Sequence, residues 1–134
     1  MENTSDALVG KLRIESLSRQ GDFSRIYAKG KRYRTPLLTA VVHRDEAPVA
    51  VRAAYVVSKK VAKQAVRRNL IRRRLREALR LLLPGDTRPV DIVLIAHREA
   101  VAADYWQLHA ALHGILTRMG LTPAQEPGRQ PQER

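Results

Sequence analysis

Residues 57–80, VSKKVAKQAVRRNLIRRRLREALR, combine dense positive charge with helical spacing, and the rest of the chain is best interpreted from them. Between residues 59 and 80 there are ten lysines and arginines and one acid, Glu77. A run of like charge usually repels itself into a disordered segment. Because apolar residues recur among these charges, the pattern instead predicts an amphipathic helix that offers its charges to an acidic partner.

The predicted helix, residues 65–83, has two distinct faces. The apolar positions, which fall on one stripe and predict a core contact, are Ile71, Leu75, Ala78 and Leu82. The polar positions, which fall on roughly the opposite side, are Asn69, Arg72, Arg73, Arg76 and Arg80. Guanidinium groups donate paired hydrogen bonds to phosphate oxygens. A solvated surface is the plainer interpretation of a charge run, but three consecutive arginines, residues 72–74, of which only Arg73 has an acid at i±4 (Glu77), destabilise an isolated helix.

Composition points to the same kind of partner. The 134 residues carry 25 Lys and Arg against 13 Asp and Glu, a net charge of +12, and 44% of them are hydrophobic. Such a chain is long enough for one domain with a core, and its charge is typical of a protein that binds RNA or DNA. An anionic membrane surface is the alternative. The absence of cysteine excludes disulfides and thiolate metal sites.

The remaining segments predict a mixed α and β domain. A short helix over residues 19–29 is expected to be capped by Ser18 and ended by Gly30. Strands over residues 37–43 and 47–58 suggest a hairpin around Asp45 and Glu46. The apolar run within residues 84–97 predicts a strand buried on both faces.

A last helix should begin at Asp104, which can form a capping box with Gln107, and should end at Gly120. These elements predict the α+β class, with a single sheet and helices mainly on one side. We expect one domain over residues 11–121 between polar tails at 1–10 and 122–134. The first residues lack the layout of a signal peptide, and no apolar run approaches the ~20 residues of a spanning helix. The sequence therefore predicts a cytoplasmic protein with no membrane partner.

The basic stretch resembles the signature of the protein component of bacterial ribonuclease P. That signature runs Ser-Lys-Lys-hydrophobic-Gly-Lys, then Arg-Asn, two residues, Lys-Arg, two residues and Arg-Glu. The matching residues here are Ser58, Lys59, Lys60, Val61, Lys63, Arg68, Asn69, Arg73, Arg76 and Glu77. The segment DFSRIYAKGKR, residues 22–32, and the DIVLIAH run, residues 91–97, are similar to the family as well. The sequence departs from the family pattern at Tyr27, Val41, Ala54, Ala62 and Leu70.

The resemblance implies an α-β-β-β-α-β-α sandwich with a left-handed βαβ crossover. It also implies that a catalytic RNA uses Mg²⁺ to remove the 5′ leader of precursor transfer RNA, so no catalytic residue is expected in the protein. The contacts to the catalytic RNA that it implies are Lys59, Lys60, Lys63, Arg72, Arg73, Arg76 and Arg80. The leader contacts that it implies are Phe23, Tyr27, Thr39, Val41, Arg68 and Asn69.

Phe23 and Tyr27 lie one helical turn apart, so they can offer aromatic surfaces to unpaired bases. Burial of both in the core is the competing interpretation. His109 and His113 also lie one turn apart, but no third ligand is near them in the sequence, and surface histidines are the plainer interpretation.

Three other functions stay open at this point. A non-catalytic RNA scaffold, such as a ribosomal protein or an assembly factor, has the same charge and size. An autonomous nuclease needs a cluster of acids to hold metal ions, and the acids here are scattered. A membrane-surface protein needs a wide apolar face opposite the charges, and the stripe on the basic helix is narrow.

Overall fold

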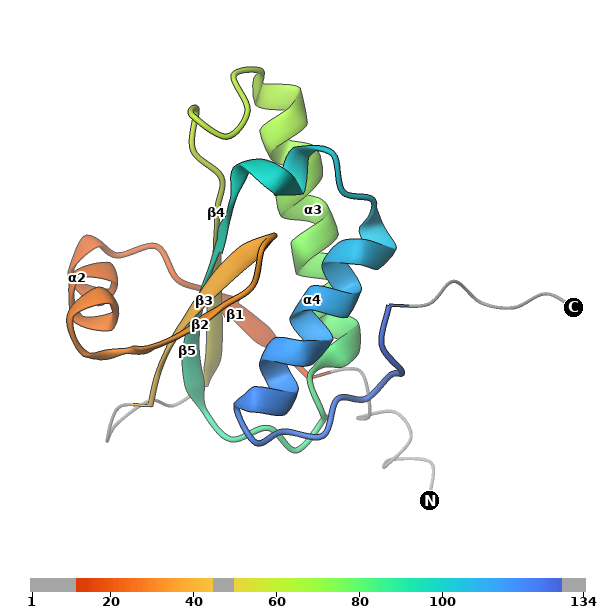
Figure 1. Ribbon diagram of the computed structural model, residues 1–134. Coiled ribbons are helices and arrows are strands. Elements are labelled where there is room, and N and C mark those ends of the chain that lie inside the picture. The colour runs from red at the N-terminus through yellow and green to blue at the C-terminus, as the bar shows by residue number, and fades with distance from the viewer. Residues whose placement is uncertain (1–11, 45–49, 129–134) are drawn as a thin grey trace, which may run out of the picture.

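The computed structural model describes residues 12–44 and 50–128 (Figure 1). One sheet of five strands separates the helices into two layers, with α3 and α4 on one face and α2 on the other. The elements in chain order are β1 (Ile14–Ser16), α2 (Gln20–Lys29), β2 (Lys31–Arg34), β3 (Leu38–His43), β4 (Val51–Val56), α3 (Ala65–Leu82), β5 (Val90–Ala96), the 3-10 helix η1 (Arg98–Val101) and α4 (Tyr105–Arg118). This arrangement confirms the predicted α+β class.

The strand order is β1-β4-β5-β3-β2, with the last strand of the chain at the centre. β5 pairs with β4 in parallel and with β3 in the antiparallel direction. The predicted hairpin between β3 and β4 is therefore wrong, and the turn expected at Asp45 and Glu46 lies outside the described residues. The physical reason is the apolar run of β5, which is covered on both faces as predicted and therefore takes the centre of the sheet.

The main core lies between the sheet and the pair α3 and α4. The predicted stripe on α3 is confirmed, because Ile71, Leu75, Ala78 and Leu82 are all buried. α4 contributes Leu108, Leu112, Ile115 and Leu116 to the same cluster. Each large side chain buried in this way contributes about 1.5–3 kcal/mol of hydrophobic stabilisation. This burial holds α3 on the sheet.

α2 covers the opposite face through a much smaller cluster. Ile26 is its one fully buried side chain, and it packs with Leu17, Val41, Ala54 and Val93. The helix begins after Arg19, which makes no side-chain cap, so the predicted cap at Ser18 is wrong. It ends at Gly30 as predicted. A Cβ at position 30 would lie 2.6 Å from the carbonyl oxygen of Ile26 and 2.8 Å from Cγ1 of Val41, so glycine is required there.

The capping box of α4 is confirmed by both of its hydrogen bonds. The backbone N–H of Gln107 donates to Oδ1 of Asp104, and the backbone N–H of Asp104 donates to Oε1 of Gln107, each at 2.8 Å. The helix ends before Gly120, whose φ of 88° suits glycine. Beyond it, the N–H of Ala124 donates to the carbonyl of Leu82 at 2.8 Å, so residues within the predicted C-terminal tail contact α3.

Candidate RNA-binding surface

The arginine face of α3, by which we mean Asn69, Arg72, Arg73, Arg76 and Arg80, lies on the side of the helix away from its buried stripe. Arg72 is half-buried and the other four side chains are exposed. Because the apolar stripe on the opposite side holds α3 on the sheet, the arginines are presented on a rigid element. A helix supported in this way can offer several guanidinium groups to one phosphate chain.

Few acids neutralise this face. Arg80 donates two hydrogen bonds to the carboxylate of Glu77, at 3.2 and 2.7 Å. These bonds lower the pKa of Glu77 and raise the pKa of Arg80. Arg72 donates to Oδ1 of Asn69 at 2.7 Å, and neither Arg73 nor Arg76 forms an ion pair with a described acid.

Three lysines extend the positive charge into the loop before α3. Lys59, Lys60 and Lys63 are all exposed. Nη1 of Arg68 donates to the carbonyls of Ala62 and Lys63 at 3.0 and 2.7 Å, and so holds this loop against the first turn of α3. The lysines and arginines predicted to contact the catalytic RNA thus lie on the loop before α3 and on α3 itself, and Arg68 joins these two segments through its hydrogen bonds.

The aromatic pair lies on α2, across the sheet from α3 (Figure 1). The ring centroids of Phe23 and Tyr27 are 6.2 Å apart with an angle of 41° between the planes. Tyr27 is 37% exposed, while Phe23 is half-buried against the cluster under α2. The guanidinium of Arg32 lies 6.0 Å from the Tyr27 ring. The pair is therefore partly exposed and has a cation beside it.

Thr39 and Val41, the predicted leader contacts on the sheet, are buried. Val41 is 0% exposed beneath α2, so a direct contact between its side chain and RNA is not available in this structure. Thr39 shares a 2.8 Å hydrogen bond with Nε2 of His97, whose Nδ1–H donates to the carbonyl of Pro36 at 3.2 Å. Both side chains are buried on the face of the sheet that α2 covers, because odd-numbered residues of β3 point to that face.

A buried ion network, which the sequence analysis missed, fixes α2 on the sheet. Asp91 is 0% exposed and accepts two hydrogen bonds of 2.8 Å from Nε and Nη2 of Arg52. Asp22 of α2 lies 3.4 Å from Arg52 and 3.0 Å from Arg25, which is itself 3.6 Å from Asp91. The hydrogen bond from Arg52 to Asp91 raises the pKa of Arg52. A sequence signal existed, since Arg52 and Asp91 each interrupt an apolar strand.

Within residues 12–44 and 50–128, no three His, Asp or Glu side chains gather as metal ligands would. His109 is 1% exposed and its Nε2 lies 2.9 Å from Oε1 of Gln125, so its interpretation as a surface histidine is wrong. The segment after α4 covers it. No helix in the same part of the chain is long and apolar enough to cross a membrane.

Comparisons with known proteins agree with one another. The sequence profile of the family described as Ribonuclease P matches residues 12–120. A "Ribonuclease P protein component" of Pseudanabaena is 38% identical over 102 residues, which cover 76% of this chain and 88% of the relative. One from Chloroflexus aurantiacus is 37% identical over 116 residues, covering 84% and 82%.

Solved structures show the same fold. The ribonuclease P protein of Staphylococcus aureus superposes with a TM-score of 0.68 and 26% identity, covering 81% of this chain and 98% of that one. The protein from Thermotoga maritima gives a TM-score of 0.65 and 26% identity, with 78% and 96% covered. These likenesses support the main prediction over a ribosomal or assembly-factor scaffold. The chain belongs to the ribonuclease P family, as a protein component of that RNA-based endoribonuclease.

Proposed function

We propose that this chain binds the catalytic RNA of ribonuclease P through the four arginines of the arginine face of α3 together with Lys59, Lys60 and Lys63. The observation that carries the proposal is the charge of this surface, where Glu77 is the one acid along α3 and it is paired with Arg80. A rigid row of guanidinium groups with one acid among them is costly to keep unless a polyanion neutralises it. In this proposal the protein acts in the cytoplasm and has no membrane partner.

The α2 side of the sheet binds the single-stranded 5′ leader of precursor transfer RNA in this proposal. Phe23 and Tyr27 offer ring faces to unpaired bases, and Arg32 beside Tyr27 can neutralise a leader phosphate. Thr39 and Val41 act indirectly, because they are buried and hold the sheet beneath α2 in shape. Arg68 and Asn69, at the start of α3, remain candidates for leader contacts.

Mg²⁺ supplies the chemistry of phosphodiester hydrolysis when it is bound, by stabilising charge on the reacting oxygens. The described residues do not form a cage for this ion, since they bring no three ligating side chains together. The ions are therefore held mainly by the RNA subunit in this proposal, and the protein contributes binding and orientation of the substrate.

The test combines a triple variant with a charge-matched control. Replacing Arg72, Arg73 and Arg76 by alanine removes about three phosphate contacts. The dependence of log K on log salt for the catalytic RNA should then flatten by roughly 0.7–0.9 per contact. Replacing Arg13, Arg88 and Arg98, which are exposed outside α3, changes the net charge equally and should alter the slope far less.

Cleavage of precursor transfer RNA gives the second measurement. Purified protein freed of RNA should not cleave at any Mg²⁺ concentration, and activity should appear when the catalytic RNA is added. Equal salt slopes for both triple variants, or turnover by the protein alone, would contradict the proposal.

A further inference from the structure

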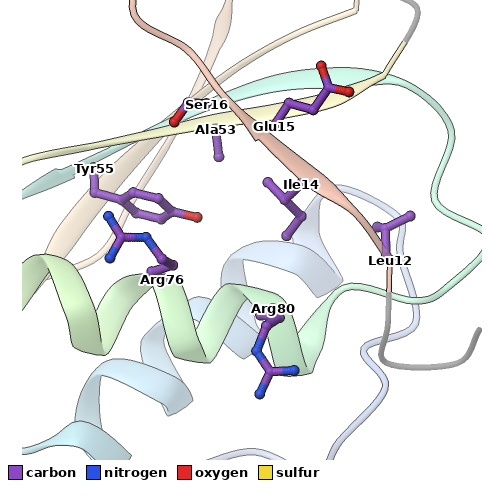
Figure 2. A pocket seen from close by; sticks show the side chains of 8 residues that line it. All are labelled: Leu12, Ile14, Glu15, Ser16, Ala53, Tyr55, Arg76 and Arg80. Atoms are coloured by element: carbon purple, nitrogen blue, oxygen red, sulfur yellow. The ribbon is translucent and has the colours of Figure 1, made fainter.

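A pocket of about 160 Å³ opens between α3 and the edge of the sheet at β1 (Figure 2). Its lining consists of Leu12, Ile14, Glu15, Ser16, Ala53, Tyr55, Arg76 and Arg80. β1 and β4 supply the apolar part of its lining, and the two arginines come from the arginine face of α3. The pocket therefore adjoins the surface that we assign to the catalytic RNA, yet the phosphate contacts proposed there do not use it.

Tyr55 supplies an unused hydrogen-bond donor. Its hydroxyl points across the pocket toward Ile14 (Figure 2), and no described residue accepts a hydrogen bond from it. Burial raises the pKa of Tyr55 to about 12, so the phenol keeps its proton at neutral pH. The guanidinium of Arg76 lies 5.2 Å from the centroid of the ring and holds it in place.

The mouth of the pocket is positively charged. Arg76 forms no ion pair with a described acid, whereas the guanidinium of Arg80 is paired with Glu77 and points away from Tyr55 and Ile14 in Figure 2, so Arg76 supplies this charge. Glu15 also borders the pocket, but its carboxylate points away from it in Figure 2 and interacts with Arg52 on the other side of the sheet. An anionic group is therefore favoured at the mouth, beside an apolar interior.

Size narrows the class of ligand. The volume is below the ~300–1,000 Å³ of pockets that enclose drug-sized molecules, so there is room for one flat ring. Aliphatic walls at Leu12 and Ile14 suit the face of such a ring, and the Tyr55 hydroxyl suits an acceptor on its edge. An anion at Arg76 would then be attached to that ring. A nucleotide has these three properties, and RNA is recognised through unpaired bases that leave the stack.

We propose that this pocket receives one unpaired base of the catalytic RNA, with the phosphate of the same nucleotide at Arg76. The inference rests on the proposed function, because it names an RNA element that the arginine face engages. A base in the pocket gives α3 a contact that depends on RNA structure, whereas phosphate contacts alone cannot distinguish one RNA from another. The pocket thus supplies specificity beside a surface that supplies affinity.

Two variants test the pocket without changing charge. Tyr55→Phe removes only the hydroxyl, and Ala53→Leu places a larger side chain in the space for the base. We expect binding of the catalytic RNA to weaken about three- to tenfold for Tyr55→Phe, the range for one hydrogen bond. For Ala53→Leu we expect about ten- to hundredfold, the range for one stacked base. The salt slope should stay unchanged for both, since no phosphate contact is lost.

The matched control is Tyr33→Phe. Tyr33 also lies under a guanidinium, that of Arg118 at 5.5 Å, but it is on β2 at the far edge of the sheet. This variant should bind the catalytic RNA like the wild type. Thermal unfolding of all three variants shows whether a loss of binding reflects a loss of fold. If Ala53→Leu does not fold, Tyr55→Phe still tests the pocket.

Chemical probing of the RNA bases shows directly whether a base is protected by the protein. The measurement uses protein concentrations that saturate the RNA with each variant. At least one unpaired base should be protected by the wild type and by Tyr33→Phe, and should regain reactivity with Tyr55→Phe and Ala53→Leu. Identical base reactivities for all folded variants, together with equal affinities, would overturn the pocket and leave the proposed function intact. Failure of the wild type to bind the catalytic RNA would instead overturn the proposed function, and the pocket with it.

Discussion

The two helices that carry the proposed RNA contacts are attached to the sheet by different forces. α3 has 18 residues and buries a stripe of five, Ile71, Leu75, Ala78, Leu79 and Leu82. α2 has 10 residues and buries Ile26 alone, while Asp22 and Arg25 tie it to Asp91 and Arg52. One helix is held by apolar packing and displays charge, and the other is held partly by charge and displays aromatic rings.

In the proposed function, this difference follows from which side chains each helix leaves free to contact RNA. Arginines that contact phosphates cannot also anchor their helix, so α3 relies on its leucines. Phe23 is only half-buried and Tyr27 is partly exposed, so α2 buries little apolar surface and ion pairs beneath its first turn supplement the small cluster around Ile26. Four substitutions test this contrast, beginning with the one that should cost the most stability.

Leu75→Ala should cost about 3–5 kcal/mol of unfolding free energy, because Leu75 is 0% exposed and its removal leaves a cavity between α3 and the sheet. Urea unfolding measures this loss. Leu81→Ala, on the half-buried side of the same helix, is the matched control and should cost clearly less. Equal losses for the two variants would show that the stripe does not anchor α3.

Asp91→Asn should cost about 2–3 kcal/mol, somewhat below the ~3–5 kcal/mol for breaking a fully buried pair, since Arg52 is 26% exposed. Hydrogen exchange should become faster in α2 while α3 keeps its protection. Asp86→Asn, at an exposed position, serves as the control. If exchange accelerates equally in both helices, the network is a general stabiliser and not an anchor for α2.

Phe23→Ala should weaken binding of precursor transfer RNA by about 1–3 kcal/mol, the contribution of one stacked base. Binding of mature transfer RNA, which has no leader, and assembly with the catalytic RNA should change little. If Phe23 is mainly a core residue, the substitution should instead lower the melting temperature and weaken every RNA interaction together. Measuring melting beside both affinities separates the two outcomes.

Glu77→Gln should lower stability the least of the four substitutions, and it should strengthen binding of the catalytic RNA. The pKa of Glu77 is lowered by its hydrogen bond from Arg80, so the pair stabilises the fold above the unfolded pKa, and this stabilisation is lost as pH falls through the lowered folded pKa. At pH 7 the variant should lose at most ~0.5 kcal/mol, because both side chains are 47% exposed. Affinity for the catalytic RNA should rise, since Arg80 is released. Weaker RNA binding at unchanged stability would contradict this role.

The helices were predictable because their signals are local. The spacing of leucines on α3 and the Asp104–Gln107 box of α4 each lie within one element, and both are confirmed. Strand pairing depends on residues far apart, so the expected hairpin of β3 with β4 was wrong although both strands exist. β1 was missed because three residues are too few to show an alternation.

The site was predictable where family motifs carry it and less so where packing decides. The arginine face followed from periodicity, but the burial of Val41 and Thr39 follows from where α2 crosses the sheet. Arg52 and Asp91 face each other in the register of β4 and β5, which residues 39 positions apart do not reveal. The sequence does not identify Tyr55 as part of a pocket, because within an apolar strand a residue that lines a pocket looks the same as a core residue.

The central place of β5 also governs when the protein can fold as it is synthesised. Leu38 of β3 pairs with Ala96, so the two halves of the sheet have no common strand until residues 90–96 have left the ribosome. Pairings between such distant residues close large loops and make folding slow relative to helix formation. A nascent chain that ends before Val90 already contains every arginine of α3 but lacks the strand that joins β3 to β4. The complete sheet, which holds α2 on one face and α3 on the other, can therefore assemble only after Ala96 has been synthesised.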